Sequence, residues 1–443
     1  MKKKALAIFM AGVLTFGLAA CGSSSSTGSS AESAAPAEST AAGSDAAEST
    51  AAESSAADAA AEDVDYGSGN ITIWVAEEVP AFTQTQAEQF LQDNPAYSGY
   101  TVTVEAVGEG DAASNMITDV EGGADIYGFA QDQLARLVSA GAVMEVIGDY
   151  ADFVSTSNDS GAVSAATMGD SIYAFPVTSD NGYFLYYDSS VISAEDAQTV
   201  DGILAAAAAA GRTFDMTLND GWYIYSFFAG AGLEATLADD GVNTVCNWNE
   251  APGADVAQAV MDIASNSAFV SAPDADIVSG IKNGTVCAAV SGTWNAKVAQ
   301  ETWGENYAAT KLPTYTLGGE QVQMGSFAGY KLVGVNPHSA NVGVAMMLAD
   351  YITNEANQQK RFEDRQLGPS NINVNASDAV QSAPAIAALA AQSDFADLQR
   401  VGANYWDPAA SLGQILQSGD TQGKTTQQLV DDAVAGITAP VAQ

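Results

Sequence analysis

The chain has 443 residues, and its 14 lysines and arginines face 54 aspartates and glutamates, for a formal net charge of −40. Such a chain lacks the basic clusters that binding to nucleic-acid phosphates requires, and anionic lipid does not attract it by charge. We interpret the charge as a soluble, self-repelling surface; adaptation to high salt or to cationic ligands is the alternative.

The first twenty residues have the order of parts of a secretory signal. Three lysines at positions 2–4 precede the apolar residues 5–20. This apolar run is shorter than the roughly 20 residues that a helix needs to span a bilayer. We therefore expect residues 1–20 to be a signal peptide that is removed, and not a transmembrane helix.

The apolar run ends in Leu-Ala-Ala-Cys at residues 18–21. Small residues directly before a cysteine resemble the lipobox of bacterial lipoproteins, in which the cysteine thiol receives a diacylglyceryl group and becomes the new N-terminus. The resemblance implies a lipid anchor on Cys21. An ordinary signal with an incidental cysteine is the alternative.

Residues 21–69 consist almost wholly of serine, alanine, glycine, threonine and acidic residues. A segment of this composition buries too little apolar surface to offset its chain entropy, so we expect it to be disordered. We interpret it as a tether that holds a folded body away from a membrane. A processed pro-segment is the alternative.

Residues 70–443 exceed what one hydrophobic core usually serves, so we expect two lobes. Strand-like and helix-like patterns alternate along them, which predicts an α/β fold with largely parallel sheets. The expected strands are 70–75, 100–107, 125–129, 171–177, 183–187 and 285–290, and the expected helices are 82–94, 131–140, 200–210, 277–282 and 341–353. The strands 171–177 and 183–187 are expected to be neighbours around the turn-rich segment 178–182.

Cysteine and histidine are scarce. Beyond Cys21 the chain has only Cys246 and Cys287, and its one histidine is His338. An exported location permits a disulfide between the two cysteines, and two buried thiols are an equal alternative. A single histidine leaves little scope for Cys–His or Ser–His catalysis and excludes the usual Cys/His zinc sites. We therefore expect no catalytic residue, no metal and no cofactor.

Seven segments of the body form a familiar order: NITIWV, YTVTVEAV, GGADIYGFAQDQLARLVSAGAVMEV, SIYAFPVTSDNGYFLYYD, IKNGTVCAAVSGTWNA, YAATKLPT and SFAGYKLVGVNPHS. This order resembles the extracellular solute-binding proteins of sugar ABC importers, nearest the maltose- and maltodextrin-binding type. The resemblance implies a type II periplasmic-binding-protein fold, with two α/β lobes, crossover hinge strands and an interlobe cleft. It implies an N-terminal lobe of 70–178 plus 329–380 and a C-terminal lobe of 179–328 plus 381–443.

The resemblance also implies which residues contact the ligand. The aromatic candidates are Phe129, Trp294, Trp406 and either Trp222 or Tyr223, because the register there is uncertain by one residue. The polar candidates are Glu77, Glu78, Gln131, Asp132 and Asp180, the last in a crossover at 178–182. Flat rings cover the apolar faces of a sugar, and charged groups bond its hydroxyls. Core packing of the rings and solvation of the carboxylates are the structural alternatives.

Two departures from the maltose-binding type leave the identity of the sugar undetermined. The loop after the first strand lacks the lysine of the maltose-binding type, and Gln133 stands where that type has an arginine.

The function that the resemblance implies is binding, without catalysis. The protein is expected to capture an oligosaccharide, such as a maltodextrin or another α-glucoside, by hinge closure and to deliver it to an ABC permease. It is expected to be a monomer, lipid-anchored to the outer face of the cytoplasmic membrane of a bacterium, Gram-positive given the long tether. The alternatives are a different solute (another sugar or a polyamine), a glycosidase with two carboxylates, and a surface adhesin.

Overall fold

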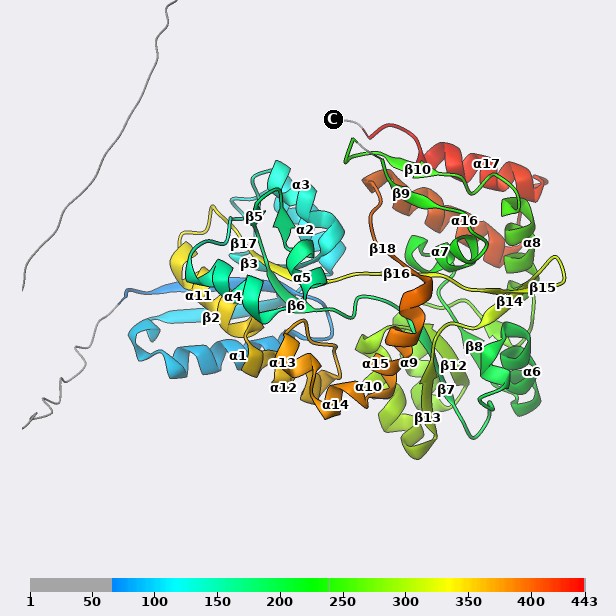
Figure 1. Ribbon diagram of the computed structural model, residues 1–443, viewed down its shortest axis with the longest axis horizontal. Helices are drawn as coiled ribbons and strands as arrows, with labels where there is room; N and C mark the ends of the chain where they lie inside the picture. The colour runs from blue at the N-terminus through cyan, green and yellow to red at the C-terminus, as the bar shows by residue number, and fades with distance from the viewer. Residues whose placement is uncertain (1–65, 239, 442–443) are drawn as a thin grey trace, which may run out of the picture. The chain divides into compact units, whose positions relative to one another are not determined.

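The computed structural model describes residues 66–238 and 240–441 (Figure 1). The expected signal peptide, Cys21 and nearly all of the expected tether lie outside the described residues. The ring of Tyr66 stacks on that of Tyr97 with 4.9 Å between the centroids. The first strand then begins at Gly69, one residue before the expected start.

The N-terminal lobe is built on a five-stranded sheet in the order β2-β1-β3-β17-β6. Its strands are β1 Gly69–Val75, β2 Tyr100–Ala106, β3 Ile126–Ala130, β6 Phe175–Thr178 and β17 Lys331–Val335. β1 is parallel to β2 and β3, whereas β17 is antiparallel to both β3 and β6. Its helices are α1 Pro80–Asp93, α2 Glu109–Thr118, α3 Leu134–Ser139, α4 Asp149–Ser157, α5 Ser160–Ala165, α11 Val342–Thr353 and α12 Glu355–Arg365.

Apolar side chains of this sheet are buried on both faces, as in other sheets covered by helices on two sides. Ile71 and Ile73 of β1 belong to one core cluster with Phe90 of α1. Tyr127 and Phe129 of β3 belong to a second cluster. The sheet is therefore the middle layer of an α/β/α arrangement.

The C-terminal lobe has its own five-stranded sheet in the order β11-β8-β12-β7-β13. Its strands are β7 Phe184–Asp188, β8 Thr213–Asp215, β11 Phe269–Val270, β12 Val286–Ser291 and β13 Tyr307–Thr310. Its helices are α6 Val200–Ala210, α7 Gly221–Gly230, α8 Gly253–Ala264, α9 Asp274–Asn283, α10 Thr293–Trp303, α15 Pro384–Gln392, α16 Trp406–Ser418 and α17 Thr426–Ile437. β8 is parallel to β11 and β12, and β7 is antiparallel to β12 and β13.

Short elements complete the fold. They are the strand pairs β4 Thr167–Met168 with β5 Ser171–Ile172, β9 Ala235–Leu237 with β10 Thr244–Cys246, β14 Thr314–Leu317 with β15 Glu320–Gln323, and β16 Ser326–Ala328 with β18 Ala396–Leu398, and the helices α13 Ile372–Asn375 and α14 Asp378–Gln381. Within the described ranges, no helix has the length and apolar composition needed to cross a bilayer.

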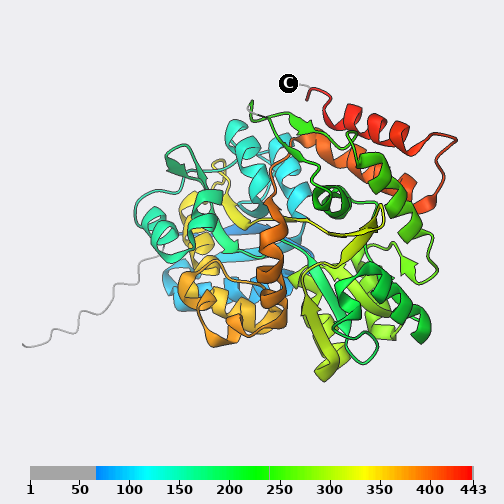
Figure 2. The same ribbon diagram turned by 45° about the vertical axis from the view of Figure 1, so that its right-hand side comes forward.

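Three stretches of chain connect the two lobes: β6 to β7, β16 to β17, and α12 to α15 (Figures 1 and 2). The expectation that strands 171–177 and 183–187 are neighbours is wrong. β6 pairs with β17, whereas β7 pairs with β12 and β13 in the other sheet. The polar segment 178–182 is therefore a crossover between lobes, as the resemblance implied, and not a turn between paired strands.

Local signals explain why the helices begin and end where they do. Thr199 caps α6 by accepting a hydrogen bond from the Gly202 amide, and Gly211 ends the helix at φ +64°. Gly284 ends α9 at φ +79°, the left-handed conformation that glycine adopts without strain. The sequence therefore predicts these boundaries well.

Candidate ligand-binding site

The carboxyl ends of three parallel strands meet at one edge of the N-terminal sheet. Glu78 follows β1, Glu109 follows β2 and Asp132 follows β3. β17 runs the other way, so its first residue, Lys331, lies at the same edge, opposite Ala130 of β3. In open α/β sheets, ligands bind at this edge.

The corresponding edge of the C-terminal sheet carries two of the aromatic candidates. Trp222 follows β8 in the first turn of α7, where the Asp220 carboxylate caps the helix by accepting from the Trp222 amide at 2.8 Å. Trp294 follows β12 in the first turn of α10. A Cβ on Gly292 would lie 1.9 Å from the Trp294 ring, so this close approach requires glycine.

The two edges contact each other. Thr293 donates its hydroxyl to the Asp180 carboxylate at 2.6 Å, and the Gly368 amide donates to the same oxygen at 2.5 Å. Asp180 thus joins the β6–β7 crossover to α10 and to the α12–α15 connection. Lys331 of the N-terminal sheet lies over the Trp294 ring, 5.2 Å from its centroid.

Lys331 is also paired with two carboxylates. Its Nζ lies 3.2 Å from Glu109 and 3.8 Å from Glu78. Burial lowers the pKa of Lys331, but these carboxylates outweigh burial and raise its pKa above the ordinary value. Burial raises the pKa of Glu109 despite the nearby ammonium.

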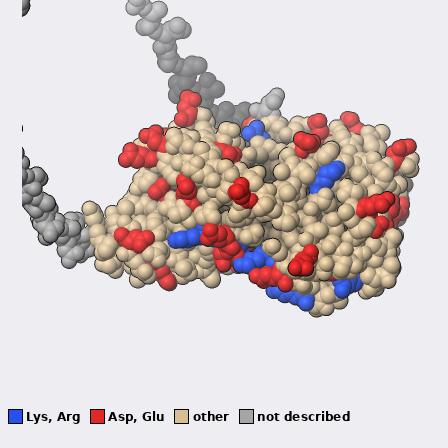
Figure 3. Space-filling model, turned by 60° about the horizontal axis from the view of Figure 1, so that its bottom comes forward, with Lys and Arg blue, Asp and Glu red and all other residues tan. Residues whose placement is uncertain are grey.

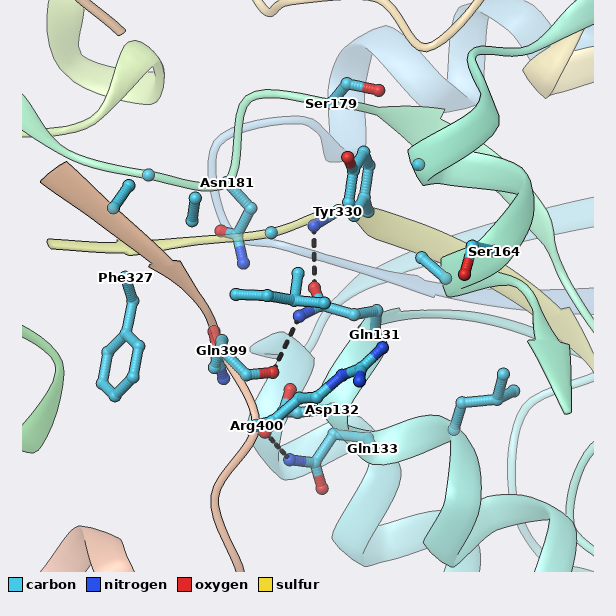
Figure 4. Close-up of a pocket in the computed structure, with 18 of the residues that line it drawn as sticks. Gln131, Asp132, Gln133, Ser164, Ser179, Asn181, Phe327, Tyr330, Gln399 and Arg400 are labelled. Carbon is cyan, nitrogen blue, oxygen red and sulfur yellow. Dashed lines mark hydrogen bonds between the residues drawn. The ribbon is translucent and has the colours of Figure 1, made fainter. Parts of the chain in front are cut away.

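A cavity of about 890 Å³ lies beside the interlobe crossovers (Figure 4). Gln131 spans it: its amide nitrogen donates to the Gln399 carbonyl at 3.0 Å, and its amide oxygen accepts from the Tyr330 amide at 2.7 Å. The cavity is lined by Tyr330 but not by Lys331. Consecutive side chains of an extended chain point to opposite sides. The cavity therefore lies on one side of the β16–β17 crossover, and Lys331 with Glu78, Glu109 and Trp294 lies on the other.

Three polar atoms at the site are buried without a hydrogen-bond partner: Asp132 Oδ1, Asp180 Oδ1 and Trp222 Nε1. Burial raises the pKa of Asp132 to about 7, although the Gln133 amide donates to its other oxygen at 2.7 Å and lowers it. A buried polar atom without a partner costs free energy.

The structure distributes the predicted residues over three places. Gln131, Asp132, Asp180 and Trp406 line the cavity. Glu78 and Trp294 meet at Lys331. Trp222 is half-buried, with its ring 5.5 Å from that of Phe327, which in turn lies 6.3 Å from Trp406. Glu77 is exposed beside Glu78.

Two predicted aromatic residues are not brought to the site. Phe129 is fully buried in the N-terminal core, 5.6 Å from the Tyr127 ring, because its side chain points into the cluster that β3 forms with α2 and α3. Tyr223 is 4% exposed and packs on Tyr183 at 5.0 Å. Of the two register alternatives, Trp222 is the ring that remains partly exposed.

Cys246 and Cys287 are unbonded, buried thiols. Burial raises the pKa of Cys246 to about 12 and that of Cys287 to about 11. Among the residues that the structure describes, no group of acidic, histidine or cysteine side chains has the arrangement of a metal site.

Sequence reasoning missed Lys331, Thr293 and Gln399. Lys331 had a signal: it is a rare basic residue directly before the apolar run LVGV, which predicts a strand with a charge at its end. Thr293 and Gln399 had none, because they contact Asp180 and Gln131 across the interlobe space.

Comparison with known proteins gives consistent results. A family model described as bacterial extracellular solute-binding protein matches residues 85–388. A galactooligosaccharide-binding protein of Bacillus subtilis (strain 168) is 30% identical over 154 residues, 34% of this chain; the chain spans only 35% of that curated relative.

Solved structures match over a longer stretch. One, of a protein with acarbose, has 29% identity and a TM-score of 0.74 over 84% of this chain and 99% of the other. The maltodextrin-binding protein of L. casei BL23, solved without ligand, has 24% identity and a TM-score of 0.68 over 84% of this chain and 100% of the other, a likeness in fold. The family model matches more than half of this chain, and the chain therefore belongs to the bacterial extracellular solute-binding proteins.

Proposed function

We propose that the protein binds an oligosaccharide between its two lobes and serves as the substrate-binding component of a sugar ABC importer. One observation carries the proposal. Around the interlobe crossovers, Asp132, Asp180 and Trp222 each hold a buried polar atom without a partner.

The chemistry of the site suits a sugar. Trp222, Trp294 and Trp406 offer ring faces for the apolar sides of pyranose rings, and the carboxylates accept hydrogen bonds from hydroxyls. The solute class is also supported by the galactooligosaccharide-binding relative and by the structural neighbour with acarbose. A maltodextrin or another α-glucoside is the ligand that we propose.

Capture follows from the division of the site between lobes. A ligand that contacts both edges binds the closed arrangement of the lobes more tightly than the open one and so shifts the equilibrium toward closure. The crossovers between the lobes act as the hinge. The closed monomer then docks on the permease.

The surface of the protein is acidic. On the face in Figure 3 the acidic side chains are widely spread and the basic side chains are few.

The location that we propose is the outer face of the cytoplasmic membrane of a Gram-positive bacterium. The membership of an extracellular family supports an exported protein. The lipobox-like residues 18–21 and the polar segment 21–69 support a lipid anchor on Cys21 and a tether.

A ligand screen tests the proposal. The melting temperature is measured with maltodextrins, galactooligosaccharides and monosaccharides, because a ligand that binds only the folded state raises it. Trp294→Ala and Trp406→Ala should each weaken binding of the best sugar by at least about 1 kcal/mol, roughly fivefold. Trp303→Ala, in the core at the far end of α10, is the control for affinity.

Two results would contradict the proposal. One is the absence of any melting shift across the panel. The other is release of glucose from maltotriose by the purified protein, which would indicate a glycosidase instead.

A further inference from the structure

Lys331 is held by groups from both lobes. Its side chain is only 13% exposed, and its Nζ contacts Glu109 at 3.2 Å and Glu78 at 3.8 Å. On the other lobe, the Trp294 ring centroid is 5.2 Å from the same nitrogen. Two carboxylates and an aromatic face are the groups that recognise a primary ammonium.

Two further carboxylates face this position. Asp180 of the β6–β7 crossover acts on Lys331 electrostatically. Asp274, the first residue of α9, accepts a hydrogen bond from the Trp294 indole at 2.8 Å. It also interacts electrostatically with Glu78 and Lys331. The ammonium of Lys331 thus interacts with carboxylates from four segments of the chain.

We propose that Lys331 is a specificity-determining residue: its ammonium fills a cation site formed by Glu78, Glu109 and the Trp294 ring and closes the ligand site to cationic solutes. The protein carries its own cation where a free ammonium ligand would bind. A neutral oligosaccharide has no charge to be repelled and is admitted. The inference deepens the proposed function, since it explains how an acidic cleft selects a neutral solute.

The test compares variants in their affinity for spermidine, measured by titration calorimetry. Lys331→Met keeps most of the stem and removes the charge, so the site loses its internal cation. We expect this variant to bind spermidine at least tenfold more tightly than the wild type does, and to lose that gain when salt is raised, because the attraction is electrostatic. Lys331→Arg keeps the charge and should behave as the wild type.

A matched control separates the site from the acidic surface. Lys297 lies on α10, the helix that carries Trp294, but its ion pair is with Asp364 at 3.7 Å, outside the cluster. Lys297→Met changes the net charge by the same amount and should leave spermidine affinity unchanged. Adding Trp294→Ala to Lys331→Met should abolish the gain, because the aromatic wall of the cation site is then missing.

The outcomes are decisive. Equal spermidine affinity of the wild type and Lys331→Met, or an equal gain in Lys297→Met, would overturn the inference. If Lys331→Met fails to fold, judged by its melting curve, Lys331→Gln replaces it. Failure of maltotriose and the other sugars to bind the wild type would count against the proposed function alone, because the spermidine comparison does not depend on a sugar.

Discussion

The hydroxyl of Thr293 donates a 2.6 Å hydrogen bond to the carboxylate of Asp180, which joins the start of α10 to the crossover between the lobes. The Gly368 amide donates to the same oxygen. A single carboxylate thus connects three segments that lie 75 or more residues apart in the chain.

Asp180→Asn should therefore weaken both folding and ligand binding. The substitution removes the charge from two charge-assisted hydrogen bonds, each worth about 1.5–3 kcal/mol against about 1 kcal/mol for a neutral bond. We expect the free energy of unfolding in urea to fall by about 1–2 kcal/mol and sugar affinity to fall about tenfold. Asp255→Asn, on the exposed side of α8, is the control. An unchanged urea midpoint would contradict the role of Asp180.

Trp222→Phe should separate ligand binding from stability. Its indole nitrogen is buried without a partner, so removing it relieves a penalty of about 1 kcal/mol in the free protein. Sugar affinity should nevertheless fall, because the phenyl ring cannot donate to a hydroxyl. The control is Trp248→Phe: Trp248 Nε1 is likewise unpartnered, but the residue is fully buried in the C-terminal core. That variant should leave affinity unchanged; an equal loss in both would refute the prediction.

Asp132 should make stability depend on pH. Burial raises its pKa from 3.8 to about 7, so the folded protein holds a proton that the unfolded chain releases. Its contribution is fully present below pH 4 and is lost as the pH rises to 7. Asp132→Asn should therefore gain about 1–3 kcal/mol over the wild type between pH 5 and pH 8, after discounting for partial exposure. Urea unfolding at both pH values measures this, and parallel pH profiles would sink the prediction.

Cys246 and Cys287 should resist alkylation in the folded protein. Both thiols are buried, and burial raises the pKa of each above 10, so the reactive thiolate is scarce. Iodoacetamide should modify both residues only in guanidinium, as read by mass spectrometry of their peptides. Recovery of a disulfide-linked pair of peptides from unreduced protein would show instead that Cys246 and Cys287 are bonded to each other.

The elements of the fold follow closely from local sequence. The expected helix 200–210 coincides with α6 because Thr199 and Gly211 are unambiguous end signals. The expected strand 100–107 matches β2, Tyr100–Ala106, because alternation of apolar and polar residues has the period of a strand. Which sheet a strand joins is not local, so the local pattern made 171–177 and 183–187 neighbours, whereas the resemblance gave 178–182 as the crossover that the structure has.

The site was predictable only in part. Glu78 and Trp294 both contact Lys331, but nothing in the chain near either residue indicates that Lys331 lies between them. Phe129 was misplaced because a buried ring and a stacking ring look alike in sequence, and the two faces of β3 are distinguished only by what packs on them.

Because Lys331 lies over the Trp294 ring, the fluorescence of Trp294 should depend on whether the two lobes are open or closed. The ammonium belongs to one lobe and the indole to the other, so their separation changes whenever the hinge moves. A positive charge near an indole shifts its fluorescence emission, and Trp294 would report domain closure without any attached dye. With Trp74, Trp248 and Trp303, which lie outside the site, replaced, the emission of Trp294 can be followed in real time as ligand is added.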